Sequence, residues 1–183
     1  MGLDVRFGYA DTSRGQIHYR EAGTGPPVVF FHESPFSSAV FHEALPRLAH
    51  RVRAIAPDTP GYGASTPPSE PLSIVDYAER MSLFLDALGL EQVPLVGSHT
   101  GGAIAIQVAV DRPERVPALM VIGCPLFEEK ERQHLLERYL RPFAPSLDGK
   151  HLITIWSRYQ RALGPDPPVA LLHLLTTELF RAM

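Results

Sequence analysis

Five consecutive residues near the middle of the chain have types and a spacing that could do chemistry. They are Gly97, Ser98, His99, Thr100 and Gly101. Glycines two positions before and two after a central residue are typical of a sharp strand-to-helix turn that exposes the central side chain at its tip. An imidazole at such a tip can act as a nucleophile or as a general base on water. The stretch therefore favours His99 as a catalytic residue; an inert side chain on a pocket floor is the open alternative.

Either neighbour of His99 fits the tip less well. With Ser98 at the tip, the flanking small positions would hold Val96 and Thr100, which are β-branched and too bulky. With Thr100 at the tip, Ser98 and Gly102 would flank it, but the turn would move one residue into the helix. His99 is therefore the predicted tip residue.

Strands and helices alternate around this turn. Two short alternating runs, residues 5–10 and 16–21, predict a β-hairpin. An apolar run without alternation, typical of a strand with both faces covered, occupies residues 28–31. Further strands are predicted at residues 52–56, 92–96 and 116–122. Apolar residues at helical spacing occupy 38–50, 74–88 and 103–110. Such a series builds a mostly parallel sheet flanked by helices, so the predicted fold class is α/β.

Two of these helices carry further signals. Ser73 is a suitable N-cap for the helix at 74–88, with Asp76 three residues later and Gly89 at its end. The helix at 103–110 is apolar almost all round, which predicts burial against the sheet.

The pattern changes after Pro125. From residue 128 onward, helical segments are broken by Pro- and Gly-containing stretches at 141–149 and 164–168, and no strand is predicted. The sequence thus divides into an α/β part, residues 1–124, and a helical part, residues 125–183.

Three unusual loops follow predicted strands and would meet at the edge of a parallel sheet where ligands bind. They are HESP at 32–35, DTPGYGAS at 58–65 and GSHTGG at 97–102. In this order they resemble the loops of the α/β-hydrolase superfamily, in particular its epoxide hydrolase and haloalkane dehalogenase-like branch with a helical cap. The resemblance covers residues 5–183 and places His99 where the family has a nucleophilic serine.

The resemblance implies a function for each part of the chain. Residues 1–124 would be the first part of an α/β-hydrolase core, and residues 125–183 an incomplete helical cap. The full-length protein would hydrolyse an ester, epoxide or related bond of a small organic molecule. Because the family's acid and histidine partners follow the cap, this chain is expected to be a fragment that is inactive by itself.

The resemblance also implies an oxyanion hole. It would use the backbone N–H groups of Thr100 and of Glu33 or Ser34. Glu33 replaces the usual glycine, and its carboxylate would oppose an anion unless it points away or engages a cation. Phe36 and Trp156 are candidate pocket residues. The cap aromatics that could line an apolar pocket, or simply pack the cap helices, are Phe127, Tyr139, Phe143, Trp156 and Tyr159.

Two other functions stay open. A protein that kept the pocket but lost the nucleophile would bind a small ligand without turnover. Some members of the superfamily are lyases or cofactor-free oxygenases that abstract a proton, and a base at the tip suits that chemistry. The histidines lack metal-ligand spacing, so neither a metal nor a cofactor is expected.

Composition limits the partners. A net charge of -3 offers no basic surface for nucleic acid, and no stretch approaches the roughly 20 apolar residues that span a bilayer. The single cysteine, Cys124, excludes an internal disulfide and indicates a reducing, cytoplasmic location. We therefore expect an apolar small-molecule substrate. We also expect self-association, because the strand at 116–122 would be an unpaired sheet edge.

Overall fold

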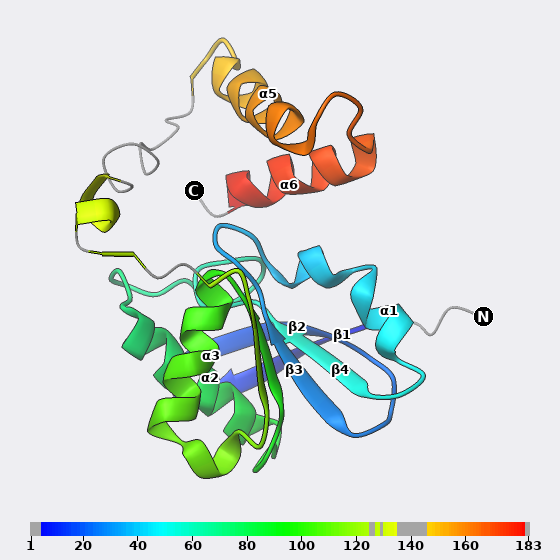
Figure 1. Cartoon of the computed structure of the whole chain (residues 1–183), viewed down its shortest axis with the longest axis vertical. Coiled ribbons are helices and arrows are strands. Elements are labelled where there is room, and N and C mark those ends of the chain that lie inside the picture. Colours follow the sequence, from blue (N-terminus) through cyan, green and yellow to red (C-terminus); the bar gives the residue numbers. More distant parts are fainter. Residues whose placement is uncertain (1–4, 125–126, 129, 135–145, 182–183) are drawn as a thin grey trace. The chain divides into compact units, whose positions relative to one another are not determined.

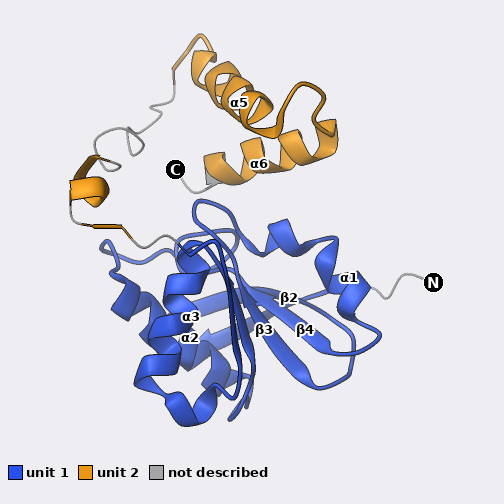
Figure 2. Cartoon of the chain, in the orientation of Figure 1, with its two compact units in different colours: residues 1–124, 182 blue, residues 125–181, 183 orange. Residues whose placement is uncertain are grey.

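The computed structural model describes residues 5–124, 127–128, 130–134 and 146–181. The chain divides into two compact units, residues 1–124 and residues 125–181 (Figure 2). All the described strands belong to the first unit.

The first unit is built on a six-stranded sheet with the order β1-β2-β4-β3-β5-β6 (Figure 1). The strands are β1 (Arg6–Thr12), β2 (Gly15–Ala22), β3 (Pro27–Phe31), β4 (Arg53–Pro57), β5 (Leu95–Ser98) and β6 (Leu119–Ile122). β2 runs antiparallel to both β1 and β4, and the other neighbouring strands are parallel. The predicted α/β class with a mostly parallel sheet is confirmed.

Helices cover both faces of this sheet. They are α1 (Ala44–Leu48), α2 (Ile74–Ala87) and α3 (Thr100–Asp111), with short 3-10 turns at Ser38–Phe41 and Pro113–Arg115. Val29 and Phe31 of β3 belong to the core cluster formed with α2 and α3, whereas Phe30 between them packs with Leu45 of α1. This alternation explains why β3 is apolar throughout, because each of its faces meets a helix layer.

The predicted single helix at 38–50 is wrong. The structure instead has the 3-10 turn Ser38–Phe41 and the separate five-residue helix α1. Pro46 gives the physical reason: it has no N–H to donate to the carbonyl of His42, so one continuous helix cannot form across this stretch.

The predicted start of α2 is confirmed. The Ser73 hydroxyl accepts a hydrogen bond from the Asp76 N–H, and the Asp76 carboxylate accepts one from the Ser73 N–H, which completes a capping box. Met81 and Leu85 of the apolar face are fully buried. The capping box therefore sets where α2 begins, and one apolar face packs the helix into the core.

β5 and β6 begin later than predicted, and α3 is less buried than predicted. β5 begins at Leu95 and β6 at Leu119, in both cases shortly after a proline, Pro94 or Pro117, that has no N–H for the sheet. The prediction that α3 is buried is only partly right. Ile104, Ala105 and Val108 are buried, but Ile106 and Val110 are 37% and 68% exposed.

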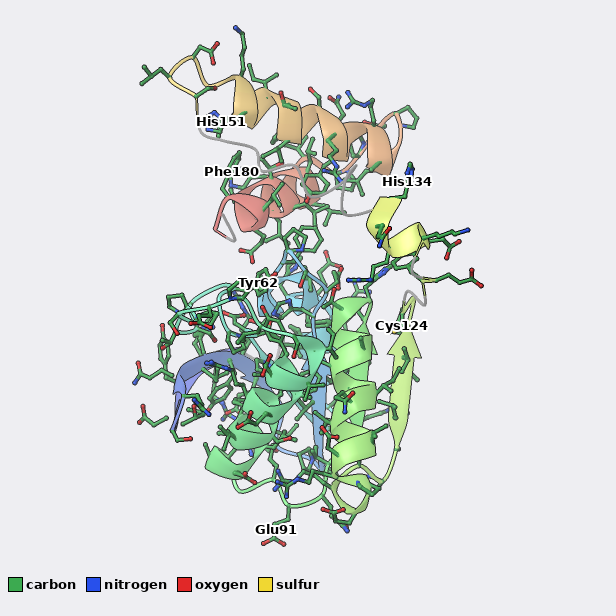
Figure 3. All side chains as sticks on the ribbon, turned by 90° about the vertical axis from the view of Figure 1, so that its left-hand side faces the viewer. Tyr62, Glu91, Cys124, His134, His151 and Phe180 are labelled. Carbon is green, nitrogen blue, oxygen red and sulfur yellow. The ribbon has the colours of Figure 1, made fainter. Side chains whose placement is uncertain are left out.

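The second unit contains α5 (Lys150–Leu163) and α6 (Val169–Arg181). Ile155 of α5 and Leu172 of α6 are buried. Figure 3 labels His151 and Phe180, whose rings meet edge to face at 5.7 Å and join the two helices. As predicted, the described part of this unit has no strand. Among the described helices of the chain, none is long and apolar enough to cross a membrane.

Candidate functional site

The three unusual loops follow β3, β4 and β5, which lie side by side in parallel. Their carboxyl ends therefore meet at one edge of the sheet, as predicted. The amino end of α3 joins them there, because a Cβ at Gly101 would clash with the carbonyl oxygens of Phe31 and His32. The turn and the loop at 32–35 are thus in direct backbone contact.

His99 occupies the tip between β5 and α3. Its φ of 47° and ψ of -111° make it the one non-glycine residue with positive φ in the described part of the chain. Its N–H donates to the carbonyl of Ile122 at 2.8 Å, and its own carbonyl accepts from the N–H groups of Gly102 and Ala103. These three bonds hold a conformation that costs a side-chain-bearing residue free energy. The strained residue is His99 rather than Ser98 or Thr100.

Two glycines make this turn sterically feasible. A Cβ at Gly97 would clash with the Gly101 carbonyl, and a Cβ at Gly101 would clash with the Phe31 carbonyl. Backbone oxygens cannot move away as a flexible side chain can. The spacing of small residues around His99 is therefore a requirement of the turn.

The His99 imidazole lies against the end of β6. A Cβ built on Gly123 would stand 3.1 Å from both Cε1 and Nε2 of His99, and Gly123 itself has φ +59°. The side chain of His99 is exposed and has no hydrogen bond or ion pair with another described residue. Gly123 is not among the residues predicted from the sequence, although a glycine directly after a parallel strand at the ligand-binding edge was a usable signal.

Replacing Gly123 with alanine should displace the imidazole of His99. Gly89→Ala is the matched control, because Gly89 has φ +65° and a Cβ there would meet nothing within 4 Å. Both variants should lose about 1–2 kcal/mol of stability from the left-handed backbone. Only Gly123→Ala should shift the His99 Cε1–H resonance in a histidine NMR spectrum. Equal spectra for the two variants would contradict the contact.

His32 joins two of the loops. Its Nε2 accepts a hydrogen bond from the Thr59 N–H at 2.9 Å, so the ring proton is on Nδ1, which donates to the Glu33 carbonyl at 3.0 Å. The ring is 1% exposed. His32 therefore positions the loop that contains Glu33.

The backbone N–H of Thr100 is the other candidate donor of the oxyanion hole. It is the first N–H of α3 and has no acceptor within that helix.

Asp58 connects three separate segments of the chain. Its carboxylate accepts hydrogen bonds from the Ser38 N–H at 2.7 Å, the Ala64 N–H at 2.9 Å and His18 Nδ1 at 2.8 Å. Burial raises the pKa of Asp58, but these bonds outweigh it and lower the pKa from 3.8 to about 2. No local sequence motif marks His18, since its partner is 40 residues away.

The pocket candidates lie in different units. Phe36 is half-buried in the first unit, directly after the loop at 32–35. Trp156 lines a cavity of about 380 Å³ in the second unit. The cavity is lined by Leu152, Ile153, Trp156, His173, Thr176, Thr177 and Phe180.

The other aromatic residues of the predicted cap differ in their surroundings. Phe127 is half exposed and lines a separate hollow of about 420 Å³, while burial raises the pKa of Tyr159. Tyr139 and Phe143 lie outside the described residues. In the part of the chain that the structure describes, no three His, Cys, Asp or Glu side chains are grouped to hold a metal ion.

A model of the alpha/beta hydrolase fold family matches residues 26–172. The chain belongs to this family. The match of this α/β-hydrolase to the family includes all three loops and extends into α6. The resemblance inferred from the loops is therefore confirmed at the level of the superfamily.

Curated relatives of this α/β-hydrolase include haloalkane dehalogenases. It is 38% identical over 112 residues to haloalkane dehalogenase 2 of Mycobacterium tuberculosis, which is 61% of this chain and 39% of that protein. It is 41% identical over 104 residues to a haloalkane dehalogenase of Mesorhizobium japonicum, which is 56% of this chain and 34% of that protein. The chain thus matches about two fifths or less of the length of these relatives.

Solved structures share the fold over nearly the whole chain. E-2-(acetamidomethylene)succinate hydrolase superposes with a TM-score of 0.80 at 24% identity, covering 96% of this chain and 64% of that one. An epoxide hydrolase from Vigna radiata gives 0.78 at 21% identity, covering 97% and 68%. An N-acyl homoserine lactonase gives 0.74 at 26% identity, covering 98% and 66%.

Proposed function

We propose that the full-length protein hydrolyses an ester, epoxide or related bond of a small organic molecule, with His99 as nucleophile or general base. The observation that carries this is the retained turn, in which His99 has φ 47° and both flanking positions admit glycine alone. A strained, exposed tip residue is costly to keep and is typical of a functional site. Relatives named as dehalogenase, epoxide hydrolase and lactonase support a small-molecule substrate.

The oxyanion would be held by backbone amides. The N–H groups of Thr100 and Gly101 begin a 12-residue helix and have no intrahelical acceptor. The third donor would come from Glu33 or Ser34, on the loop that α3 contacts through Phe31 and His32. Such donors stabilise charge that develops in the transition state.

Turnover by the purified full-length protein tests this proposal. A panel of esters, epoxides and haloalkanes should include at least one compound that yields more than one product molecule per protein chain. Failure of the whole panel, with ligand affinity retained, would instead identify a binding protein. Oxygen uptake in the same assays would indicate the cofactor-free oxygenase chemistry.

Binding without turnover is the second candidate function. The observation that favours it is the His99 ring, which has no hydrogen-bonded acid or base among the described residues. A general base usually needs a partner that orients it.

The location that we propose for either function is cytoplasmic, supported by the single cysteine.

The substrate that we propose is apolar, with the second unit acting as the helical cap. The cavity beside Trp156 supports this, because Leu152, Ile153 and Phe180 also line it. Trp156 is the single tryptophan of the chain, so its fluorescence reports on this cavity alone. Titration with an alkyl ligand should change that fluorescence and saturate. Ile153→Asp should weaken binding about tenfold or more, because it places a charge in the apolar wall, whereas Val75→Asp on α2 should not.

We also propose that the first unit self-associates through β6. β6 is a sheet edge in the described chain, and its residues Leu119 to Ile122 are 38–60% exposed. An apolar edge strand is a template for pairing with a second copy. Met120→Lys should move the sedimentation of this chain toward the monomer. Val75→Lys is the control, because Val75 is 56% exposed on α2, away from the edge. A monomeric wild-type chain would contradict the proposal.

A further inference from the structure

The imidazole of His99 is placed to attack an electrophile directly. It is exposed at the tip of the turn, and no described side chain donates to or accepts from its nitrogens. Its Cε1–Nε2 edge packs against Gly123, where no Cβ displaces the ring from the tip. A neutral imidazole in this position presents one nitrogen lone pair to a bound substrate.

Attack on an acyl carbon can be completed as a cycle. The imidazole nitrogen forms a bond to the carbonyl carbon, the carbon–oxygen bond to the leaving alcohol breaks, and the alkoxide takes up, through solvent, the proton that the other ring nitrogen gives up. The nitrogen lone pair of the resulting acylimidazole belongs to the aromatic ring, so the acyl group keeps a reactive carbonyl. Water then adds to that carbonyl, the carbon–nitrogen bond breaks, and the carboxylic acid leaves with His99 restored.

Attack on a saturated carbon cannot be completed in this way. With an alkyl halide, nitrogen displaces halide and an N-alkylimidazolium forms; with an epoxide, the ring opens and the same type of carbon–nitrogen bond forms. The carbon now bound to nitrogen has no carbonyl to which water can add. His99 would therefore remain alkylated after one event.

The backbone around the tip suits the acyl route as well. Addition to a carbonyl creates an oxyanion, and the unpaired amides of Thr100 and Gly101 at the start of α3 lie at the same turn as the attacking ring. The carbonyl of His99 accepts hydrogen bonds from the N–H groups of Gly102 and Ala103. These bonds fix the amides of Thr100 and Gly101 relative to His99.

From this chemistry we infer that the substrate class for covalent turnover is acyl: carboxylic esters, including lactones and thioesters. Alkyl halides and epoxides are single-event alkylating agents of His99. The inference rests on the proposed hydrolase function and narrows it, and it separates this chain from the haloalkane dehalogenases that it resembles.

Two probes on the full-length protein test the inference, p-nitrophenyl acetate and 1-bromobutane. The ester should release more than one equivalent of p-nitrophenolate per chain. Bromide release should stop at or below one equivalent, with a butyl group retained on the peptide that contains His99, as read by mass spectrometry. Both reactions should be lost in His99→Ala. His50→Ala is the control for nonspecific attack by a surface imidazole, because His50 is exposed and lies before the opposite end of β4.

Each other outcome is decisive. Repeated bromide release that depends on His99 overturns the acyl inference but leaves the hydrolase function standing. An acetyl group that stays on His99 overturns the inference too, because the acyl cycle would then not close. Absence of any reaction at His99 with either probe overturns the inference, whereas the proposed function is contradicted only when the whole panel of esters, epoxides and haloalkanes fails.

Discussion

Replacing His99 with alanine should lower turnover of the full-length protein by at least about a hundredfold, the usual contribution of a general base or nucleophile. The physical reason is that no other imidazole or carboxylate is placed at the strained tip, where His99 alone among described non-glycine residues has positive φ. The measurement is the steady-state rate with the best ester from the panel, together with ligand affinity. Affinity should change little, since the truncation removes a reacting group and leaves the turn in place.

The neighbours of His99 provide the controls for this result. Ser98→Ala and Thr100→Ala remove the only hydroxyls of the turn and should keep most of the activity. If Ser98→Ala loses turnover while His99→Ala and Thr100→Ala keep it, Ser98 is the catalytic residue, although it does not occupy the tip of the turn. Unchanged turnover in His99→Ala would end the catalytic hypothesis for this residue.

Replacing Asp58 with alanine should destabilise the first unit by about 3–5 kcal/mol, because each buried donor left without an acceptor costs about 1–3 kcal/mol. The substitution leaves three donors without this acceptor: the buried N–H of Ser38 and the buried Nδ1 of His18, and the partly buried N–H of Ala64. Asp58 itself is 2% exposed, so water does not replace the carboxylate. Urea unfolding at neutral pH measures the loss. The exposed Asp111→Ala is the control and should change stability by less than about 0.5 kcal/mol.

The effect of Asp58 should depend on pH in one direction. Its pKa is lowered from 3.8 to about 2 in the folded chain, so its ionisation stabilises the fold at pH values above 3.8. That stabilisation, about 2 kcal/mol from the size of the shift, should disappear as the pH falls from 3.8 toward 2. The stability gap between wild type and Asp58→Ala should therefore narrow over this interval. A gap that stays constant with pH would contradict the role of the charge.

Local signals predicted much of the fold. The Ser73 and Asp76 capping box marked the start of α2 because both partners lie within one helical turn. Apolar runs located β3 and β4, since a strand covered on both faces shows its burial in its own composition. The loop that contains His99 could be recognised because the glycines required by the turn lie two residues away. In each case the predictive signal lies within a few neighbouring residues.

Prolines account for several differences between the predicted and the observed bounds of helices and strands. Pro46, at the third position of α1, lacks the N–H that a helix continuing from residue 38 would need, and Pro94 and Pro117 precede the strands that begin at Leu95 and Leu119. The apolar pattern continues through each proline, so hydrophobicity alone extended the predicted elements too far. A missing N–H is a backbone property that this pattern does not report.

The sequence by itself determined the order of strands and helices, the position of the turn at His99 and membership of the superfamily, because these depend on neighbouring residues. Tertiary structure alone decided which distant groups meet: Asp58 with His18 across 40 residues, and the His99 ring with Gly123 at the end of the next strand. It also decided that β6 is the exposed edge of the described sheet. Contacts of this kind leave no local pattern, because burial and register bring their partners together only when the sheet is assembled.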